Sequence, residues 1–292
     1  MVVKITRIES CRCLCGEGPV WDEAEQALYF LDIGRQLVHR YEPCTGSLRE
    51  WTMPKGPGAL ALREGGGAVV ALKDTIYALD LATGALTAIV TAADQPPRAT
   101  FNDGKVDRQG RFIIGSCETD MHDPKPIGGL YSLEPDGRLT RLDGDITYSN
   151  SPCFSPDGRT LYFSDSARHT IFAYPYNPHT GRVGERRVFA DTQALGGLPD
   201  GATVDREGRV WVAIFGGGKV AAFTPEGALE QIIDLPVSLP GSVMFGGRNL
   251  DQLYVVTIDP AYFGNPAEEG AGYTYVVEGL GVRGLPEPRF AG

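Results

Sequence analysis

The chain has 292 residues, of which 42% are hydrophobic, and a formal net charge of −10. This composition supports a folded core, whereas the acidic balance and the lack of basic runs argue against binding to nucleic acid or to an anionic membrane. No apolar run reaches the roughly 18 residues needed to cross a bilayer, and the charged N-terminal segment is unlike a secretory signal, so we expect a cytoplasmic protein.

Near the N-terminus, Cys11, Cys13 and Cys15 alternate along the chain. A C-x-C-x-C spacing is not that of a zinc finger, and no second pair of cysteines or histidines follows it. Alternation with a period of two places the three side chains on one face of a strand. We therefore interpret them as small buried hydrophobic residues in a reducing compartment.

A turn of the form Asp-x-x-Gly, with Ser155 at the first position of one copy, then recurs along the chain. It ends at Gly110, Gly158 and Gly208, which are 48 and 50 residues apart, and a run of strand-forming residues follows each copy. Weaker copies lie at 21–32 and 245–256. In such a turn, glycine adopts the left-handed backbone conformation and the acidic side chain bonds to nearby backbone groups.

The repeat length predicts the architecture. Further glycine-bearing turns lie between these copies, so each unit of about 48 residues reads as four short strands. Six such units fill the chain. We predict an all-β fold, a six-bladed β-propeller of four-stranded blades around a central tunnel, forming one domain over 1–292. The alternative is a pair of β-sandwich domains.

Polar residues stand at one position of this repeat. Asn102, Asn150 and Asp200 each precede a repeat glycine by eight residues, and Glu17 precedes the inner strand of the first unit. In a propeller, the first strands of all blades line the tunnel, so equivalent positions meet in space. Four such oxygen donors suit Ca²⁺, Mg²⁺, Mn²⁺ or Fe²⁺. Taken singly, an Asn or Asp beside glycine is usually a turn residue; the shared offset favours a site.

Other catalytic patterns are missing from the sequence, including a Gly-x-Ser-x-Gly elbow and a phosphate-binding loop. The four histidines lack metal-ligand spacing, and His39 reads as a strand residue. A polar loop over 118–127 separates two strands of the third unit. Such loops often act as lids, so Glu118 and His122 are further candidates for the site.

Several segments together resemble the SMP-30/gluconolactonase/regucalcin family from about residue 15 to the end. They are 16–21, 101–107, 149–152, 155–158, 199–205 and 281–290. The resemblance implies a propeller with one central divalent cation, whose identity (Ca²⁺, Mn²⁺, Mg²⁺, Zn²⁺ or Fe²⁺) stays open. It places the cation ligands at Glu17, Asn150 and Asp200, and a substrate-binding or fourth-ligand residue at Asn102, with Asp103 beside it.

The activity that the resemblance implies is metal-dependent hydrolysis of a sugar lactone to the aldonic acid, a step of carbohydrate metabolism. The partner would be this small molecule, and the protein a monomer or small homo-oligomer. One position departs from the family pattern. Many relatives have arginine two residues before the Asn-Asp-Gly motif, where this chain has Thr100, and its nearest arginine is Arg98. This difference puts the identity of the sugar in doubt.

For the mechanism, we expect the cation to polarise the lactone carbonyl and Asp200 to assist the attacking water. Three alternatives remain open at this point. The protein could be a calcium-binding regulator without turnover, a propeller scaffold for protein partners, or an organophosphate hydrolase.

Overall fold

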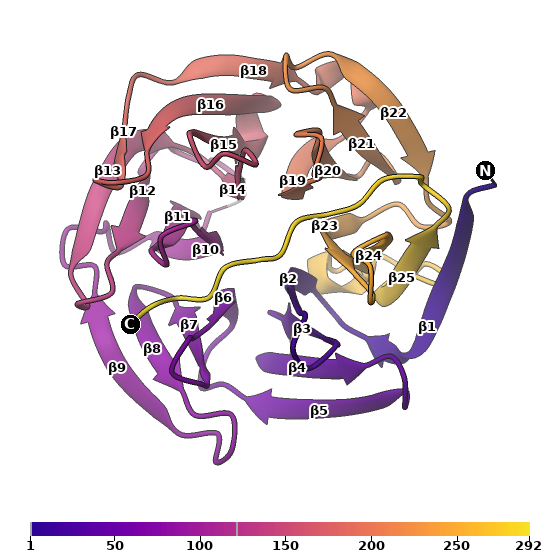
Figure 1. The fold of residues 1–292 in the computed structure, drawn as a ribbon, viewed down its shortest axis with the longest axis horizontal. Coiled ribbons are helices and arrows are strands. Elements are labelled where there is room, and N and C mark those ends of the chain that lie inside the picture. The colour runs from indigo at the N-terminus through magenta and orange to yellow at the C-terminus, as the bar shows by residue number, and fades with distance from the viewer. Residues whose placement is uncertain (1, 121) are drawn as a thin grey trace.

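The strands of the computed structural model, which describes residues 2–120 and 122–292, form six antiparallel sheets around a central axis (Figure 1). Blades one to three are β2 (Gly16–Asp22), β3 (Ala27–Asp32), β4 (Leu37–Glu42) and β5 (Ser47–Thr52); β6 (Pro57–Leu62), β7 (Ala68–Leu72), β8 (Thr75–Leu79) and β9 (Leu86–Thr91); and β10 (Ala99–Val106), β11 (Phe112–Glu118), β12 (Gly128–Leu133) and β13 (Leu139–Ile146).

Blades four to six follow the same order, with one extra short strand in blade four. They are β14 (Ser149–Phe154), β15 (Thr160–Asp165), β16 (Thr170–Asn177), β17 (Arg182–Val183) and β18 (Arg187–Asp191); β19 (Leu198–Val204), β20 (Val210–Phe215), β21 (Lys219–Phe223) and β22 (Leu229–Asp234); and β23 (Pro240–Gly246), β24 (Gln252–Thr257), β25 (Tyr273–Glu278) and β1 (Lys4–Arg12). The predicted six-bladed propeller is confirmed.

Helical structure in the described residues is limited to three 3₁₀ turns: η1 (Ser166–Arg168), η2 (Gln193–Leu195) and η3 (Pro260–Phe263). None of the described helices is long and apolar enough to cross a membrane.

The ring is closed by two strands that lie far apart in the sequence. The N-terminal strand β1 pairs antiparallel with β25, with Lys4 opposite Glu278, and becomes the outermost strand of the last blade. The last blade therefore takes three strands from one end of the chain and one from the other. This pairing ties the two ends together, and the repeat pattern did not predict it.

The repeated turns are the structural anchors of the blades. Gly110, Gly158 and Gly208 have φ values of 81°, 67° and 88°, in the region that favours glycine. The buried Asp205 shows how such a turn is fixed. Its Oδ1 accepts hydrogen bonds from the backbone of residues 207 and 209, and its Oδ2 accepts one from Trp211 Nε1. The turns that end at Gly110 and Gly208 have the predicted Asp-x-x-Gly form, and in the turn that ends at Gly158 the side chain of Ser155 takes the place of the aspartate.

Apolar side chains fill the wedges between neighbouring blades. The second strands of the blades are covered by neighbouring blades on both faces, and two of them, β3 and β11, are buried along their whole length. One cluster joins blades four and five through Tyr162, Phe189 and Phe223, with ring centroids of neighbouring pairs 4.7 and 6.4 Å apart. The packing between blades fixes the inner strands, and with them the residues at their ends.

A C-terminal strap, residues 279–292, crosses the face of the ring that carries the repeated turns (Figure 1). It contacts several blades in succession through backbone hydrogen bonds, including those of Gly284 N to Leu250 O, Phe290 N to Leu62 O and Ala291 N to Gly110 O. Phe290 is 1% exposed and packs in the core between blades two and three. The strap therefore covers the axis at one end of the channel.

The N-terminal cysteines are all buried and free, as the sequence predicted. Their placement on one strand face is wrong, because β1 ends at Arg12. Cys11 and Cys13 belong to one apolar cluster between blades six and one, whereas Cys15 lines a central cavity. His39 lies in β4, as its strand-like context indicated.

Candidate active site

The innermost strand of every blade has a break in its pairing register at the same level. The breaks fall at Glu17/Val20, Pro57/Ala59, Asn102/Gly104, Asn150/Cys153, Pro199/Ala202 and Pro240/Ser242. A bulge of this kind bends a strand and redirects its side chains. The four polar residues predicted from the repeat all lie at these breaks, at the end of the ring opposite the strap. The bulges therefore turn them towards the axis.

Two residues at these bulges have strained backbones. Asp103 and Ser151 have φ values of 51° and 61°, a conformation that residues other than glycine rarely adopt. Asp103 Oδ2 accepts a hydrogen bond from Ser151 N at 2.8 Å, and Ser151 Oγ donates to the backbone oxygen of Asp200. These contacts hold the bulges of three blades against one another. Strain of this sort is concentrated at functional sites.

A cavity of about 390 Å³ opens at this end of the axis. Six of the residues singled out from the sequence line it: Glu17, Thr100, Asn102, Glu118, Asn150 and Asp200. They come from blades one, three, four and five. Asp103, predicted to touch substrate, instead lies behind this lining, with its carboxylate bonded to Gly104 N and Ser151 N. Its position is that of a support for the bulges.

The other two blades present glycine at the corresponding bulge, Gly58 and Gly241. A Cβ atom on Gly241 would lie 2.6 Å from Glu17 Oε1, and one on Gly58 would lie 2.1 Å from Phe101 O. No side chain fits at either place without displacing its neighbours. The inward-facing polar groups are thus confined to four blades, and the two glycines let neighbouring strands approach closely at the other two.

Hydrogen bonds fix the orientation of the two carboxamides. Asn102 Nδ2 donates to Ser149 O at 2.7 Å and to Asn150 Oδ1 at 2.9 Å, and Asn150 Nδ2 donates to Ser166 Oγ at 2.9 Å. Both amide nitrogens are used by protein acceptors. Since a carboxamide oxygen has two lone pairs, oxygen is the atom that each residue offers to a ligand.

The environment of the cavity disfavours the ionised form of its carboxylates. Burial raises the pKa of Glu17 well above its usual range, and the nearby charges of Asp200 and Asp103 raise it further. Burial and the Asp103 charge likewise raise the pKa of Asp200 well above its ordinary value. Ionised carboxylates this close together need a compensating positive charge. A set of two carboxylates and two carboxamide oxygens fits a hard divalent cation, which would supply that charge.

Glu118 stands at the wall of the cavity in a different environment. Burial alone would raise its pKa, but the backbone N–H groups of Asp120 and Thr119 and the guanidinium of Arg98 donate to the carboxylate and hold the pKa below its usual value. Arg98 Nη2 lies 2.5 Å from Glu118 Oε2. Thr100 is half-buried nearby. Arg98 therefore neutralises Glu118, and Arg98 itself does not line the cavity.

An aromatic wall, defined here as Tyr148, Phe215, Tyr262 and Phe263, completes the cavity lining. The ring centroids of Phe215 and Phe263 lie 5.6 Å apart, and those of Tyr262 and Phe263 lie 5.0 Å apart. The sequence analysis missed these residues. Two of them belong to η3, which interrupts the last blade at no fixed offset from the repeat, so no pattern marked them.

Of the described residues in segment 118–127, expected as a possible lid, only the first ones line the cavity. Glu118 and Thr119 line it, and Tyr148 Oη donates to Asp120 O at 3.4 Å. His122 is exposed, and its backbone N–H donates to Asp120 Oδ1. Among the residues that the structure describes, His122 is not part of the cavity lining.

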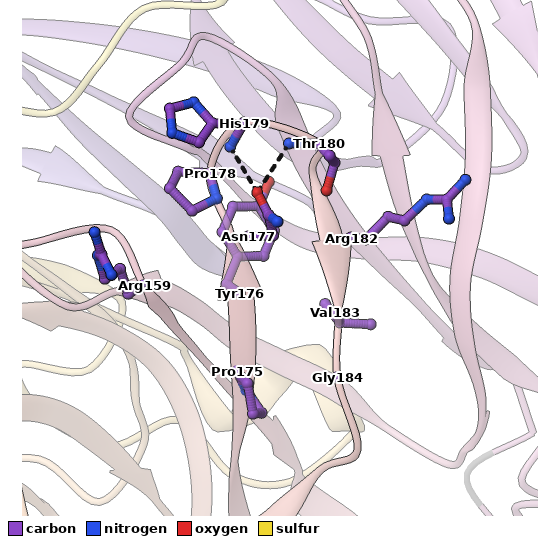
Figure 2. Close-up of a pocket in the computed structure, with 10 residues that line it drawn as sticks. All are labelled: Arg159, Pro175, Tyr176, Asn177, Pro178, His179, Thr180, Arg182, Val183 and Gly184. Carbon is purple, nitrogen blue, oxygen red and sulfur yellow. Dashed lines mark hydrogen bonds between the residues drawn. The ribbon is translucent and has the colours of Figure 1, made fainter.

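A separate depression of about 660 Å³ lies on the outside of blade four, along the hairpin of β16 and β17 (Figure 2). Figure 2 shows that the Asn177 side chain points back to its own turn, where Oδ1 accepts hydrogen bonds from His179 N and Thr180 N. The described residues that line this depression include no carboxylate. Because the central cavity brings buried carboxylates together with carboxamides, from four blades, it is the candidate active site.

Comparison with known proteins gives consistent matches over most of the chain. Residues 15–259 match the family described as SMP-30/Gluconolactonase/LRE-like region. The chain is 34% identical to the regucalcin of Xenopus laevis, covering 99% of each chain. A luciferin-regenerating enzyme is similar in structure, with a TM-score of 0.93 and 28% identity over 99% of this chain and 100% of that one. A calcium-binding protein, regucalcin, from Agrobacterium tumefaciens gives 0.88 and 28%, covering 97% and 96%.

Proposed function

Because the chain belongs to the SMP-30/gluconolactonase/LRE-like family, we propose that it is a divalent-metal-dependent lactonase that opens a sugar lactone to the aldonic acid. The observation that carries this proposal is the set of oxygen donors, Glu17, Asn102, Asn150 and Asp200, brought by four blades to one buried cavity. The calcium binding stated for the Agrobacterium relative supports a cation at this place.

Glu17, Asn150 and Asp200 would hold the cation, and Asn102 would face it from the third blade. When bound, the cation would polarise the lactone carbonyl and stabilise the negative charge that develops on its oxygen. The donor set consists of hard oxygen atoms, which favour Ca²⁺, Mg²⁺ or Mn²⁺ over cations that prefer thiolates. The two carboxamides add ligands without adding negative charge.

The protein side chains would perform the remaining steps. Asp200 accepts a proton from water as the water oxygen forms its bond to the carbonyl carbon. The ester bond between that carbon and the ring oxygen then breaks, and the proton passes to the ring oxygen, which leaves as a hydroxyl group. The product is the open-chain acid. Glu118, Thr100 and the aromatic wall would orient the sugar ring.

The experiment that tests the function measures acid release from a panel of aldonolactones, using chelator-treated protein before and after each divalent cation is restored. We expect acid release only from the cation-restored protein. If no lactone is opened with any cation, the protein is instead a calcium-binding regulator, the reading that the Agrobacterium relative's name favours. A phosphotriester in the same assay would reveal an organophosphate hydrolase.

The pH dependence of thermal stability should report on the buried carboxylates. Because the pKa values of Glu17 and Asp200 are raised in the folded, cation-free protein, protonation stabilises that state, and its stability should fall as pH rises from about 4 through these raised values. A cation that binds the ionised forms reverses this loss. The rise in Tm on adding cation should therefore be larger at about pH 8 than at about pH 5.

Melting curves with and without cation at the two pH values measure this difference, and Glu17→Gln is the control variant, in which the difference should shrink. An equal Tm rise at both pH values would contradict the assignment of these carboxylates to the cation.

The residue at position 100 should set the preference among lactones. We expect Thr100→Arg to lower KM for hydroxyl-rich lactones by about tenfold with little change in kcat, because a guanidinium offers five N–H donors where threonine offers one hydroxyl. Steady-state kinetics on lactones that differ in hydroxyl number measures the effect.

Thr100→Val is the matched control, since it keeps the size of the side chain and removes only the hydroxyl. A Thr100→Arg variant that raises KM for every lactone alike would show that this position does not contact substrate hydroxyls.

A further inference from the structure

His39 is buried without the polar partners that a buried imidazole normally has. It lies in β4, stacks on Phe30 with ring centroids 4.8 Å apart, and is 2% exposed. Neither ring nitrogen forms a hydrogen bond within the part of the chain that the structure describes. Glu50 Oε1 comes within 3.2 Å of Nδ1 but does not meet hydrogen-bond geometry. A buried polar group without a hydrogen bond suggests that a partner, such as a metal ion, is absent from the structure.

Two other metal-ligating side chains lie beside this imidazole. The Sγ atom of Cys13, a carboxylate oxygen of Asp32 and one ring nitrogen of His39 all lie within 4.8 Å of one another, and all three residues are buried. A zinc ion binds sulfur at about 2.3 Å and nitrogen or oxygen at about 2.0–2.2 Å. The three donor atoms are close enough together that small inward movements would bring them to such an ion.

A cation bound to Asp32 would take the place of its longest hydrogen bond. Its carboxylate accepts from the backbone N–H groups of Leu14, Cys15 and Arg35 at 2.8–3.1 Å, and from Arg35 Nη1 at a longer 3.4 Å. Arg35 Nη1 also donates to Arg12 O at 2.6 Å, so it keeps a partner if the longer contact is given up. The backbone bonds orient the carboxylate, as outer-shell contacts do in metal sites.

The protonation states are compatible with a thiolate-binding cation. Burial lowers the pKa of His39, so the imidazole is neutral at physiological pH and has a lone pair to offer. Burial raises the pKa of the Cys13 thiol well above its usual range. A cation must therefore displace the thiol proton, as zinc does when it binds cysteine.

We propose that Cys13, Asp32 and His39 form a second metal site, for a zinc-class cation, separate from the oxygen-lined central cavity. Its donors differ from those of the cavity in containing sulfur and nitrogen, so the two sites select different ions. Cys13 directly follows β1, the strand that completes the last blade, whereas Asp32 and His39 belong to the first blade. An ion at this site would fasten the closing strand to its neighbour.

Cobalt(II) is the spectroscopic probe for this site. The test uses full-length protein carrying Glu17→Gln and Asp200→Asn, so that the central cavity no longer competes for the ion. We expect one equivalent of Co²⁺ to bind with the intense near-ultraviolet absorption of a cobalt–thiolate bond and the visible bands of tetrahedral cobalt. One equivalent of Zn²⁺ should abolish the bands and raise Tm by about 5 °C.

Matched cysteine variants locate the sulfur ligand. Cys13→Ser should remove the thiolate absorption, whereas Cys15→Ser and Cys117→Ser, which change thiols of the central cavity, should retain it. His39→Phe, which preserves stacking on Phe30, should remove the visible bands and the Tm rise while leaving the cation-free Tm within a few degrees. Thiolate absorption that is absent from the parent protein, or that survives Cys13→Ser, would overturn the proposal.

Discussion

Replacing Asp200 with asparagine is expected to lower kcat/KM for lactone hydrolysis by about 10³-fold, the range typical for removal of a general base. The side chain lies in the cavity at a bulge of β19, where it can serve both as a cation ligand and as the acceptor of the water proton. Asparagine has the same shape and keeps one oxygen ligand, so part of the bound cation should remain. Lactone kinetics and metal content measured on the same preparation separate the two roles.

Asp234→Asn is the matched control, because this aspartate is exposed on the outer strand β22 and should leave activity unchanged. If Asp200→Asn retains full cation occupancy and comparable turnover, Asp200 is not the base. If its activity is restored by raising the cation concentration alone, the residue acts only as a ligand.

Replacing Phe290 with alanine is expected to lower the free energy of unfolding by about 3–5 kcal/mol, the usual effect of emptying a fully buried phenylalanine site. The ring is 1% exposed and packs with Phe101, Phe112 and Tyr131 between blades two and three. The flanking backbone is held by the bonds of Phe290 N to Leu62 O and Glu64 N to Phe290 O. Denaturant unfolding followed by circular dichroism measures the change.

Leu229→Ala is the comparison variant, since Leu229 is 47% exposed on an outer strand and should change stability by less than about 0.5 kcal/mol. A small effect of Phe290→Ala, similar to that of Leu229→Ala, would mean that the strap is only loosely attached to the ring.

The repeat made the fold predictable because blades of the same four-stranded form use the same turn at the same position. Gly110, Gly158 and Gly208 marked that turn, and the offset of eight residues led to three residues that the structure places around one cavity. Ring closure could not be predicted in this way. Strand β1 carries no repeat signal of its own, and its place in the last blade depends on a partner at the other end of the chain.

The candidate site was predictable only where residues share a repeat position. The aromatic residues of η3 lie in a connection inside the last blade, and Arg98 directly precedes β10, so no shared repeat position marks them and their neighbours are set by the fold alone. Asp103 was assigned to substrate because it adjoins Asn102, but adjacent residues at a bulge point in different directions. Cys13 and His39 lie 26 positions apart and meet because Cys13 lies in the link from β1 of the last blade to β2 of the neighbouring first blade.

The strap has a consequence for catalysis. Residues 279–292 cross the axis at the end opposite the cavity, so we expect a molecule that reaches the four oxygen donors to leave at the cavity end. Under the proposed function, the acid would then leave through the opening by which the lactone enters. Because substrate and product would bind at the same four oxygen donors, we expect the product to act as a competitive inhibitor.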